Sequence, residues 1–127
     1  MSPLGRTAKL GPTMSPDRRS TGPVEVFSFG ARLDAVEAGP AREAITRALA
    51  DGRRLLIFDL GPVRFMDSSG LFVLIAALKE ARAAGGAVAL VGLSREMRTV
   101  IEVARLHHVF EICEDEAAAV ALLGAPR

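Results

Sequence analysis

A chain of 127 residues, half of them apolar, has the size of one domain and can bury a hydrophobic core. Its 16 basic and 15 acidic side chains leave a formal charge of +1, which argues against a domain held to nucleic acid or to an anionic membrane by charge. Trp and Tyr are absent, which disfavours an aromatic surface that stacks the bases of single-stranded nucleic acid. The lone cysteine, Cys113, forms neither an intramolecular disulfide nor a metal site by itself.

The first 22 residues are rich in Pro, Gly, Ser and Thr, with basic side chains scattered among them. We expect a flexible tail here and the folded domain over residues 23–124. A short edge strand within residues 7–10 is an alternative for part of the tail. No apolar run resembles a signal peptide or is long enough to cross a bilayer, so the sequence predicts a cytoplasmic protein without membrane insertion.

Strands and helices are expected to alternate after this tail. Residues 24–29 alternate apolar and polar side chains, which is typical of a strand with one face on a core. Residues 54–60 contain an unbroken apolar run, which indicates a central strand covered on both faces. Between these strands we expect a helix that ends at Asp51, with Pro40 in its first turn and Gly52 after its last.

The second half of the chain continues this alternation. Helical spacing of apolar residues predicts a helix over residues 69–84, with a stripe formed by Leu71, Leu74, Ile75 and Leu78. The remaining expected elements are a strand over 87–91, a helix capped by Ser94 and reaching 105, a strand over 109–112 and a helix over 115–123. Parallel strands need crossover connections, so the sequence predicts an α/β domain with a mixed or mainly parallel sheet.

A short segment at the start of the helix 69–84 is chemically distinctive; it reads Phe65-Met-Asp-Ser-Ser-Gly-Leu71. The first N–H groups of a helix lack internal partners and the helix dipole adds positive charge, so Asp67 and Ser68 are favoured there as caps. Capping needs only one polar side chain, however. Because Gly70 also removes bulk from the surface beside Ser69, at least one hydroxyl should be left for another purpose.

The usual catalytic and nucleotide-binding patterns are missing from the sequence. It contains no phosphate-binding loop, no dinucleotide fingerprint and no Gly-x-Ser-x-Gly nucleophile elbow. The two histidines, His107 and His108, are adjacent, which is more typical of surface packing than of a catalytic base. Asp34 and Asp67 could form a carboxylate pair, but each precedes an expected helix, which favours capping. Cys113 is expected to be a small buried hydrophobic residue.

A free hydroxyl on a domain without catalytic equipment indicates modification by another protein. A phosphate on Ser68 would meet unpaired N–H groups and the positive end of the helix dipole, an interaction of about 0.3 to 1 kcal/mol, so the fold should survive it. Its charge of about −1.5 to −2 beside Asp67 would cost on the order of 2 to 5 kcal/mol inside a complementary interface. We therefore expect a switch in binding and not in folding.

The chain resembles the STAS domains of bacterial anti-sigma-factor antagonists over residues 24–123. The similarity is strongest in the segment Asp67-Ser-Ser-Gly-Leu71. It extends to Gly30-Ala-Arg-Leu-Asp34, to the strand that ends in Asp59-Leu60, to Gly92-Leu-Ser94, to residues 100–106 and to Phe110-Glu-Ile112. The resemblance implies a four- or five-stranded mixed sheet with about four helices packed mainly on one face.

The resemblance also implies a function. In such antagonists the first serine of the motif, here Ser68, is phosphorylated by a partner anti-sigma factor with serine-kinase activity. The unphosphorylated form binds that partner and releases a sigma factor, and a protein phosphatase resets the switch. ATP belongs to the kinase, so this chain is expected to be no enzyme and to hold no cofactor. The implied partner contacts are Asp34, Asp67, Ser68, Ser69, Gly70 and Leu71.

Two features depart from the family pattern, and other functions stay open. The usual first strand is poorly recognisable in the Pro-rich tail. Phe72 stands where a small residue is frequent, and it could be either an exposed partner contact or a core residue. STAS domains also serve as accessory subunits of transporters or sensory complexes, which is the alternative function. A ligand-binding module or an enzyme would need a pocket that the sequence does not show.

Overall fold

The computed structural model of the chain describes residues 16–124. Five strands form one mixed sheet in the order β1-β2-β4-β6-β7, with β1 antiparallel to β2 and every other neighbouring pair parallel. These strands are β1 (Asp17–Thr21), β2 (Val24–Ser28), β4 (Leu55–Asp59), β6 (Ala87–Val91) and β7 (Glu111–Cys113). A separate parallel ladder pairs β3 (Arg32–Leu33) with β5 (Phe65–Met66).

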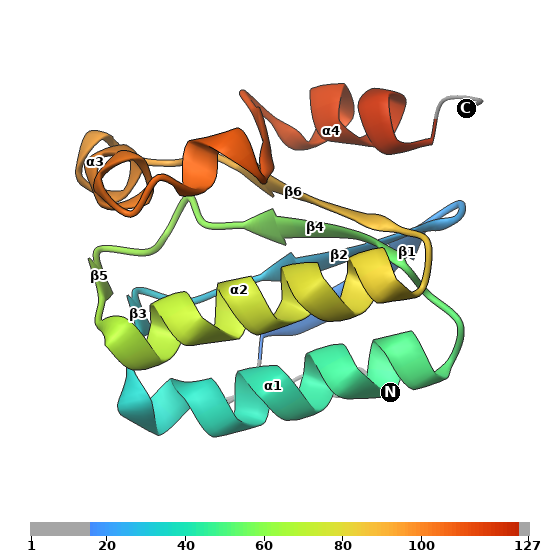
Figure 1. Cartoon of the computed structure of the whole chain (residues 1–127), viewed down its shortest axis with the longest axis horizontal. Coiled ribbons are helices and arrows are strands. Elements are labelled where there is room, and N and C mark those ends of the chain that lie inside the picture. Colours follow the sequence, from blue (N-terminus) through green and yellow to red (C-terminus); the bar gives the residue numbers. More distant parts are fainter. Residues whose placement is uncertain (1–15, 125–127) are drawn as a thin grey trace, which may run out of the picture.

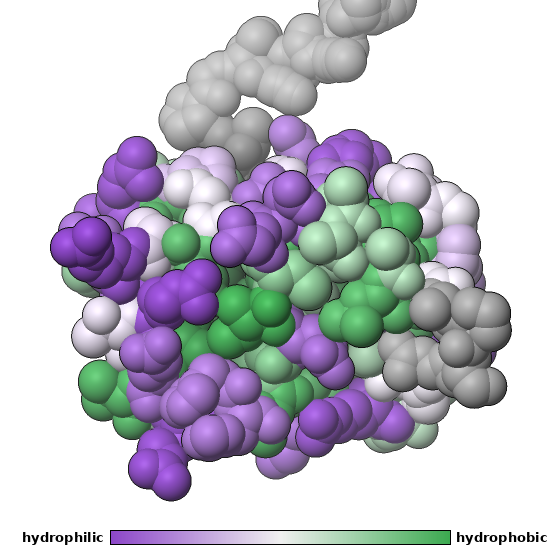
Figure 2. Space-filling model, turned by 90° about the horizontal axis from the view of Figure 1, so that it is seen from above, coloured by the Kyte–Doolittle hydropathy of each residue, from purple (hydrophilic) through white to green (hydrophobic). Residues whose placement is uncertain are grey.

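Helices cover both faces of the sheet, with more of them on one face than on the other (Figure 1). The helices are α1 (Ala35–Ala50), α2 (Ser68–Ala83), α3 (Arg95–Val103) and α4 (Glu116–Leu123), with a short 3-10 helix, η2, over Leu106–His108. Buried side chains of α1, α2 and α3 share one core with the sheet, whereas α4 packs on the opposite face. Figure 2, seen from the side of α3 and α4, shows hydrophobic and hydrophilic side chains mixed over that surface. The predicted α/β fold, with a mixed sheet and helices mainly on one face, is therefore confirmed.

The central strand β4 divides the two cores. Its side chains alternate, so that Leu56 and Phe58 pack with α1 and α2 while Ile57 packs with α4. All three side chains are fully buried. This explains the unbroken apolar run in the sequence, because a strand covered on both faces has no solvent side to mark with polar residues.

The prediction of a flexible tail over residues 1–22 is wrong for the last part of that segment. Residues 17–21 form the edge strand β1, which pairs with β2 from Asp17 opposite Ser28 to Thr21 opposite Val24. The strand is polar because its side chains make ionic contacts and not core contacts; Arg18, for example, pairs with Glu25. Composition therefore carried no strand signal. Residues 1–15, including the alternative strand at 7–10, lie outside the described residues.

Two helices differ in detail from the prediction. The helix α1 begins at Ala35, so Pro40 is its sixth residue and does not lie in the first turn. Proline has no N–H group, so the carbonyl of Val36 lacks its helical partner, and the exposure of Val36 leaves that end of the helix open to water. In α2, Leu71 and Ile75 are half-buried, because the buried face is rotated toward Gly70, Val73, Leu74, Ala77, Leu78 and Ala81.

The C-terminal elements lie close to their predicted positions. The strand β6 has the predicted bounds, and Ser94 caps α3 by accepting a hydrogen bond from the Met97 amide at 3.1 Å. The last strand lies at 111–113 and not at 109–112, since η2 precedes it. The two-residue strands β3 and β5 were not predicted, because segments this short carry no periodicity. None of the helices within residues 16–124 has the length and hydropathy that a membrane span requires.

Candidate functional site

Two helices begin side by side at one end of the molecule (Figure 1). The short ladder of β3 and β5 is the cause, because it pairs Leu33 with Met66 and so brings the next residues, Asp34 and Asp67, to neighbouring positions. Each aspartate is the N-cap of the helix that follows. The capping interpretation of both residues is thus confirmed.

The Asp67 carboxylate holds the two helix starts together. Its Oδ1 accepts hydrogen bonds from the amides of Ser69 at 2.9 Å and Gly70 at 3.1 Å, in its own helix. Its Oδ2 accepts one from the amide of Ala35, the first residue of α1, at 3.2 Å. All three donors are otherwise unpaired N–H groups of helix first turns, so one side chain satisfies both helices.

The Asp34 carboxylate both caps α1 and forms an ion pair with Arg32. Its Oδ1 accepts hydrogen bonds from the amides of Val36 at 3.1 Å and Glu37 at 3.3 Å, and its Oδ2 accepts one from Arg32 Nε at 2.9 Å. The hydrogen bond from Arg32, followed by those from the two amides, lowers the pKa of Asp34 below its ordinary value, so the group stays ionised at neutral pH. The Arg32 guanidinium also lies 4.4 Å from the centroid of the Phe65 ring.

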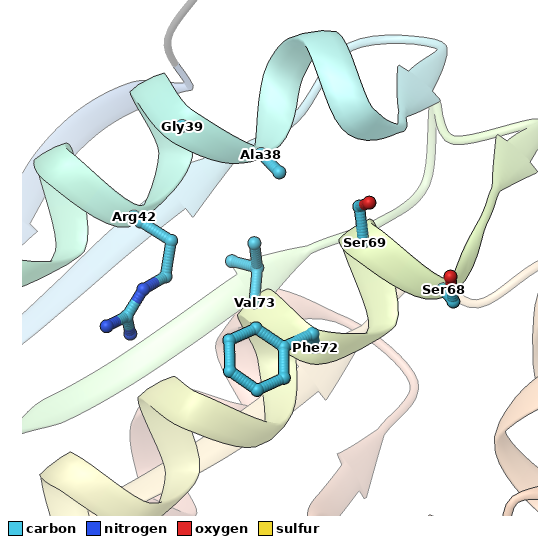
Figure 3. A pocket seen from close by; sticks show the side chains of 7 residues that line it. All are labelled: Ala38, Gly39, Arg42, Ser68, Ser69, Phe72 and Val73. Atoms are coloured by element: carbon cyan, nitrogen blue, oxygen red, sulfur yellow. The ribbon is translucent and has the colours of Figure 1, made fainter.

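Ser68 is the first residue of α2 and its side chain is exposed. Within residues 16–124 its hydroxyl has no hydrogen-bond partner, since Asp67 already provides the cap. Ser69 is half-buried and donates its backbone amide to that cap. Figure 3 shows the two serine side chains at the start of the helix, with Ser69 toward α1 and Ser68 further from it. Neither serine hydroxyl has a hydrogen-bond partner among the described residues, and the more exposed of the two is that of Ser68.

Gly70 has a different role from the one expected. It is buried, and a Cβ atom there would overlap the carbonyl oxygen of Leu33 and lie 2.9 Å from Met66 Cγ. The glycine thus allows the backbone of α2 to approach β3, and it does not reduce bulk on the surface. Leu71 is half-buried against the core formed with α1 and α2. Of the six expected contact residues, only Ser68 is fully on the surface.

A groove of about 460 Å³ runs between α1 and α2 from the serines inward, lined by Ala38, Gly39, Arg42, Ser68, Ser69, Phe72 and Val73. Phe72 is 62% exposed, so the open question about this residue is settled in favour of the surface. No motif or spacing in the sequence singles out Arg42. Its position is decided by the packing of α1 against α2, which residue spacing does not show.

The other residues singled out in the sequence lie outside this site. His107 and His108 are exposed in η2, with ring centroids 3.9 Å apart. Cys113 is half-buried beside the α4 core and not fully buried; burial, with Glu111 and Asp115 nearby, raises the pKa of its thiol. No group of three metal-ligating side chains occurs in the described part of the chain.

Comparison with known proteins gives the family. The family model of the STAS domain matches residues 15–119. An anti-sigma-B factor antagonist from Listeria monocytogenes is 32% identical over 94 residues, which cover 74% of this chain and 82% of that protein. The chain belongs to the STAS-domain anti-sigma-factor antagonists. The predicted family is thus confirmed, and the match begins ahead of β1, which makes that strand part of the STAS domain.

Solved structures share the STAS fold at low sequence identity. The anti-sigma factor antagonist SpoIIAA in its unphosphorylated form has a TM-score of 0.73 and 21% identity, over 87% of this chain and 99% of that one. Its phosphorylated form, from Bacillus, has a TM-score of 0.70 and 24% identity, over 84% and 98%. A murine anion transporter of the solute carrier 26 family matches with a TM-score of 0.72 and 18% identity, over 85% of this chain but 19% of its own. The same fold therefore also occurs as a small part of a transporter.

Proposed function

We propose that this STAS protein releases a sigma factor by binding an anti-sigma factor that has serine-kinase activity. The unphosphorylated form binds, phosphorylation of Ser68 ends the binding, and a protein phosphatase restores it. The observation that carries this proposal is the exposed hydroxyl of Ser68, which no capping role occupies among the described residues. The protein itself is a binding partner and a kinase substrate, and not an enzyme.

The geometry suits a hydroxyl that receives a phosphoryl group. The Ser68 oxygen would form the new bond to phosphorus, the bond to the leaving nucleotide would break, and the proton would pass to a base of the kinase. Asp67 is engaged by three backbone amides, so in this chain it shapes the site and does not act as the base. Ser69, one residue further on, is half-buried and is the poorer acceptor.

The contact surface follows from the same geometry. Ser68 and the exposed side of the two helix starts would touch the partner directly, with Ser69 and Leu71 at its margin. Asp34, Asp67 and Gly70 would act by fixing the two helix starts in register, since they are held by backbone contacts. The expected contact residues thus divide into those that touch the partner and those that position them.

Phosphorylation would change binding more than folding. The phosphate would lie beside the helix starts, where exposed anions gain about 0.3 to 1 kcal/mol. Inside an interface, the added charge next to Asp67 would cost on the order of 2 to 5 kcal/mol, or about thirty- to several-thousand-fold in affinity. The existence of SpoIIAA structures in both forms supports a fold that tolerates the modification.

The test is to incubate the purified chain with the anti-sigma-type kinase encoded nearest to it and with ATP, and to locate added phosphate by mass spectrometry. We expect one phosphate, on Ser68. Ser68→Ala should still bind the kinase but accept no phosphate, whereas Ser69→Ala is the matched control and should still be labelled.

Labelling that persists in Ser68→Ala would move the site to another residue. No labelling by a kinase that is active on another substrate would contradict the proposed switch. Capture of a membrane transporter in a pull-down would then favour the accessory-subunit alternative, for which the likeness to the anion transporter shows a shared fold alone.

A further inference from the structure

The groove between α1 and α2 has an apolar lining with one charged residue. Ala38, Gly39, Phe72 and Val73 provide most of its walls, and in the described part of the chain Arg42 is the one ionisable side chain that lines it. Figure 3 shows Arg42 and Phe72 projecting from their helices near one another, with Ser68 at the other end of the groove. A cation on an apolar surface is suited to an anionic group that arrives together with apolar contacts.

Arg42 has hydrogen-bonding capacity that the described residues do not use. Its Nη2 donates to Glu80 Oε2 at 3.2 Å, and both side chains of this pair are partly exposed. Its Nη1 is shielded from solvent and has no hydrogen-bond partner within residues 16–124. A guanidinium carries five N–H donors in a planar fork, which matches the two oxygens of a carboxylate. Arg42 therefore keeps donors beyond its single contact with Glu80, and its partly exposed side chain can reorient to offer two of them to an incoming carboxylate.

Phe72 supplies the apolar half of the groove. The large aromatic ring is 62% exposed on the first turns of α2, in the helix that begins with Ser68. Exposed aromatic residues and arginines are enriched among the residues that contribute most to protein interfaces. Their pairing in one groove, beside the serine proposed as the switch, marks a recognition surface and not an isolated exposed residue.

We infer that this groove receives a segment of the anti-sigma factor that carries a carboxylate side chain for Arg42 and an apolar side chain against Phe72. This inference rests on the proposed function, since it names the chemistry of the same partner. Charge complementarity selects the occupant, because among residues 16–124 Arg42 is the only charged residue that lines the groove. A phosphate on Ser68 would place negative charge at the mouth of this groove and repel the incoming carboxylate.

The test measures the affinity of the anti-sigma factor for four variants of the full chain by calorimetry. Arg42→Ala should weaken binding about tenfold or more, because it leaves the partner's carboxylate unpaired in the interface. The matched control is Arg47→Ala, which removes the same charge from an exposed site on the same helix; there Arg47 pairs with Glu43 at 3.7 Å. It should change affinity less than about twofold. Arg42→Lys should keep part of the affinity, since it keeps the charge and loses the fork.

Glu80→Gln separates recognition from structure. If Arg42 acts only by pairing with Glu80, then Glu80→Gln and Arg42→Ala should weaken binding to the same extent. If the inference is correct, Glu80→Gln keeps or raises the affinity, because it removes the carboxylate that competes for Arg42. The melting temperature of each variant, measured in parallel, shows whether the fold is intact.

The possible outcomes distinguish the two proposals. Equal affinities for Arg42→Ala, Arg47→Ala and the wild-type chain would overturn this inference and leave the proposed function standing. A loss of affinity in Arg42→Ala that occurs only when nucleotide is bound to the kinase would also overturn this inference. The group that pairs with Arg42 would then be a nucleotide phosphate and not a carboxylate of the partner. A wild-type chain that does not bind the anti-sigma factor at all would overturn the proposed function, and this inference with it.

Discussion

At the scale of single residues, the geometry of the site depends on a buried glycine. Gly70 lies where α2 passes close to β3, and a side chain there would collide with the Leu33 carbonyl oxygen. The same close approach allows Asp67 to reach the amide of Ala35 and to cap both helices. A residue that resembles a surface contact in the sequence thus controls the geometry of the switch from inside.

Gly70→Ala should destabilise the domain by about 1 to 3 kcal/mol, because either α2 or β3 must move to make room for the methyl group. The measurement is the free energy of unfolding in urea. The matched control is Gly39→Ala in α1, where an added Cβ meets no atom within 4 Å apart from its chain neighbours. That change should alter stability by less than about 1 kcal/mol, since the helix preference of alanine is opposed by the contact of its Cβ with the ring of Pro40. Equal stabilities for the two variants would contradict the packing role of Gly70.

At the scale of elements, the strands β1 and β2 are joined by a buried charge. Glu25 of β2 is 2% exposed, and its carboxylate accepts hydrogen bonds from Arg18, from Ser20 Oγ at 2.6 Å and from Arg53 Nε at 3.0 Å. Arg18 and Ser20 belong to β1, whereas Arg53 follows α1. A buried carboxylate with this many donors is fully paired, so the edge strand and the end of α1 are fixed to β2 together.

This cluster predicts how stability depends on pH. Burial opposes ionisation of Glu25, but the hydrogen bonds from Ser20, Arg18 and Arg53 outweigh it and lower the pKa of the carboxyl below its ordinary value. A lowered pKa in the folded state means that the unfolded state binds the proton first. The contribution to stability is therefore complete above the unfolded pKa, about 4.3, and is lost as the pH falls through the folded pKa.

Glu25→Gln should cost about 1.5 to 3 kcal/mol at pH 7, because charged hydrogen bonds are lost from a buried site. The difference between variant and wild type should begin to shrink as the pH falls below the unfolded pKa, about 4.3, and should vanish once the folded wild-type carboxyl is also protonated. Urea unfolding at several pH values measures this difference. Glu43→Gln, at the exposed pair with Arg47, is the control and should change stability by less than about 0.5 kcal/mol at any pH. A constant cost of Glu25→Gln across the pH range would refute the linkage.

At the scale of the whole molecule, the strand β1 connects parts that are far apart in the sequence. Arg19 in β1 donates from Nη1 to Glu116 Oε2 at 2.7 Å, at the start of α4. The same contact lowers the pKa of Glu116. Arg18, the residue before Arg19, pairs with Glu25, and its Nη2 lies 3.3 Å from Oδ2 of Asp51 at the end of α1. The edge strand β1 therefore links β2 to α1 and α4, which lie on opposite faces of the sheet.

Deletion of residues 1–22 should destabilise the domain by about 3 kcal/mol or more, since Glu25 loses two charged hydrogen bonds of about 1.5 to 3 kcal/mol each. It should also promote aggregation, because β2 would become an exposed apolar edge. Deletion of residues 1–15 is the control, since it keeps every described element. The measurements are thermal unfolding and light scattering against protein concentration. Two deletions of equal stability would show that β1 contributes nothing.

The sequence by itself determined the features that depend on neighbours in the chain. The caps Asp34, Asp67 and Ser94 and the bounds of β6 follow from local patterns, because helix caps and short apolar strands are set within a few residues. The family resemblance then supplied the mixed character of the sheet, the helices on mainly one face and the proposed partners. These predictions needed no knowledge of contacts between distant residues.

Only the tertiary structure decided the features that depend on residues far apart in the chain. The polar segment 17–21 forms a strand because Arg18 and Arg19 within it pair with Glu25 and Glu116. Gly70 is buried because α2 meets β3, and Arg42 enters the groove because α1 packs beside α2. Each of these outcomes is a long-range contact, and the free energy that fixes it comes from packing and charge pairing between segments that residue spacing cannot relate.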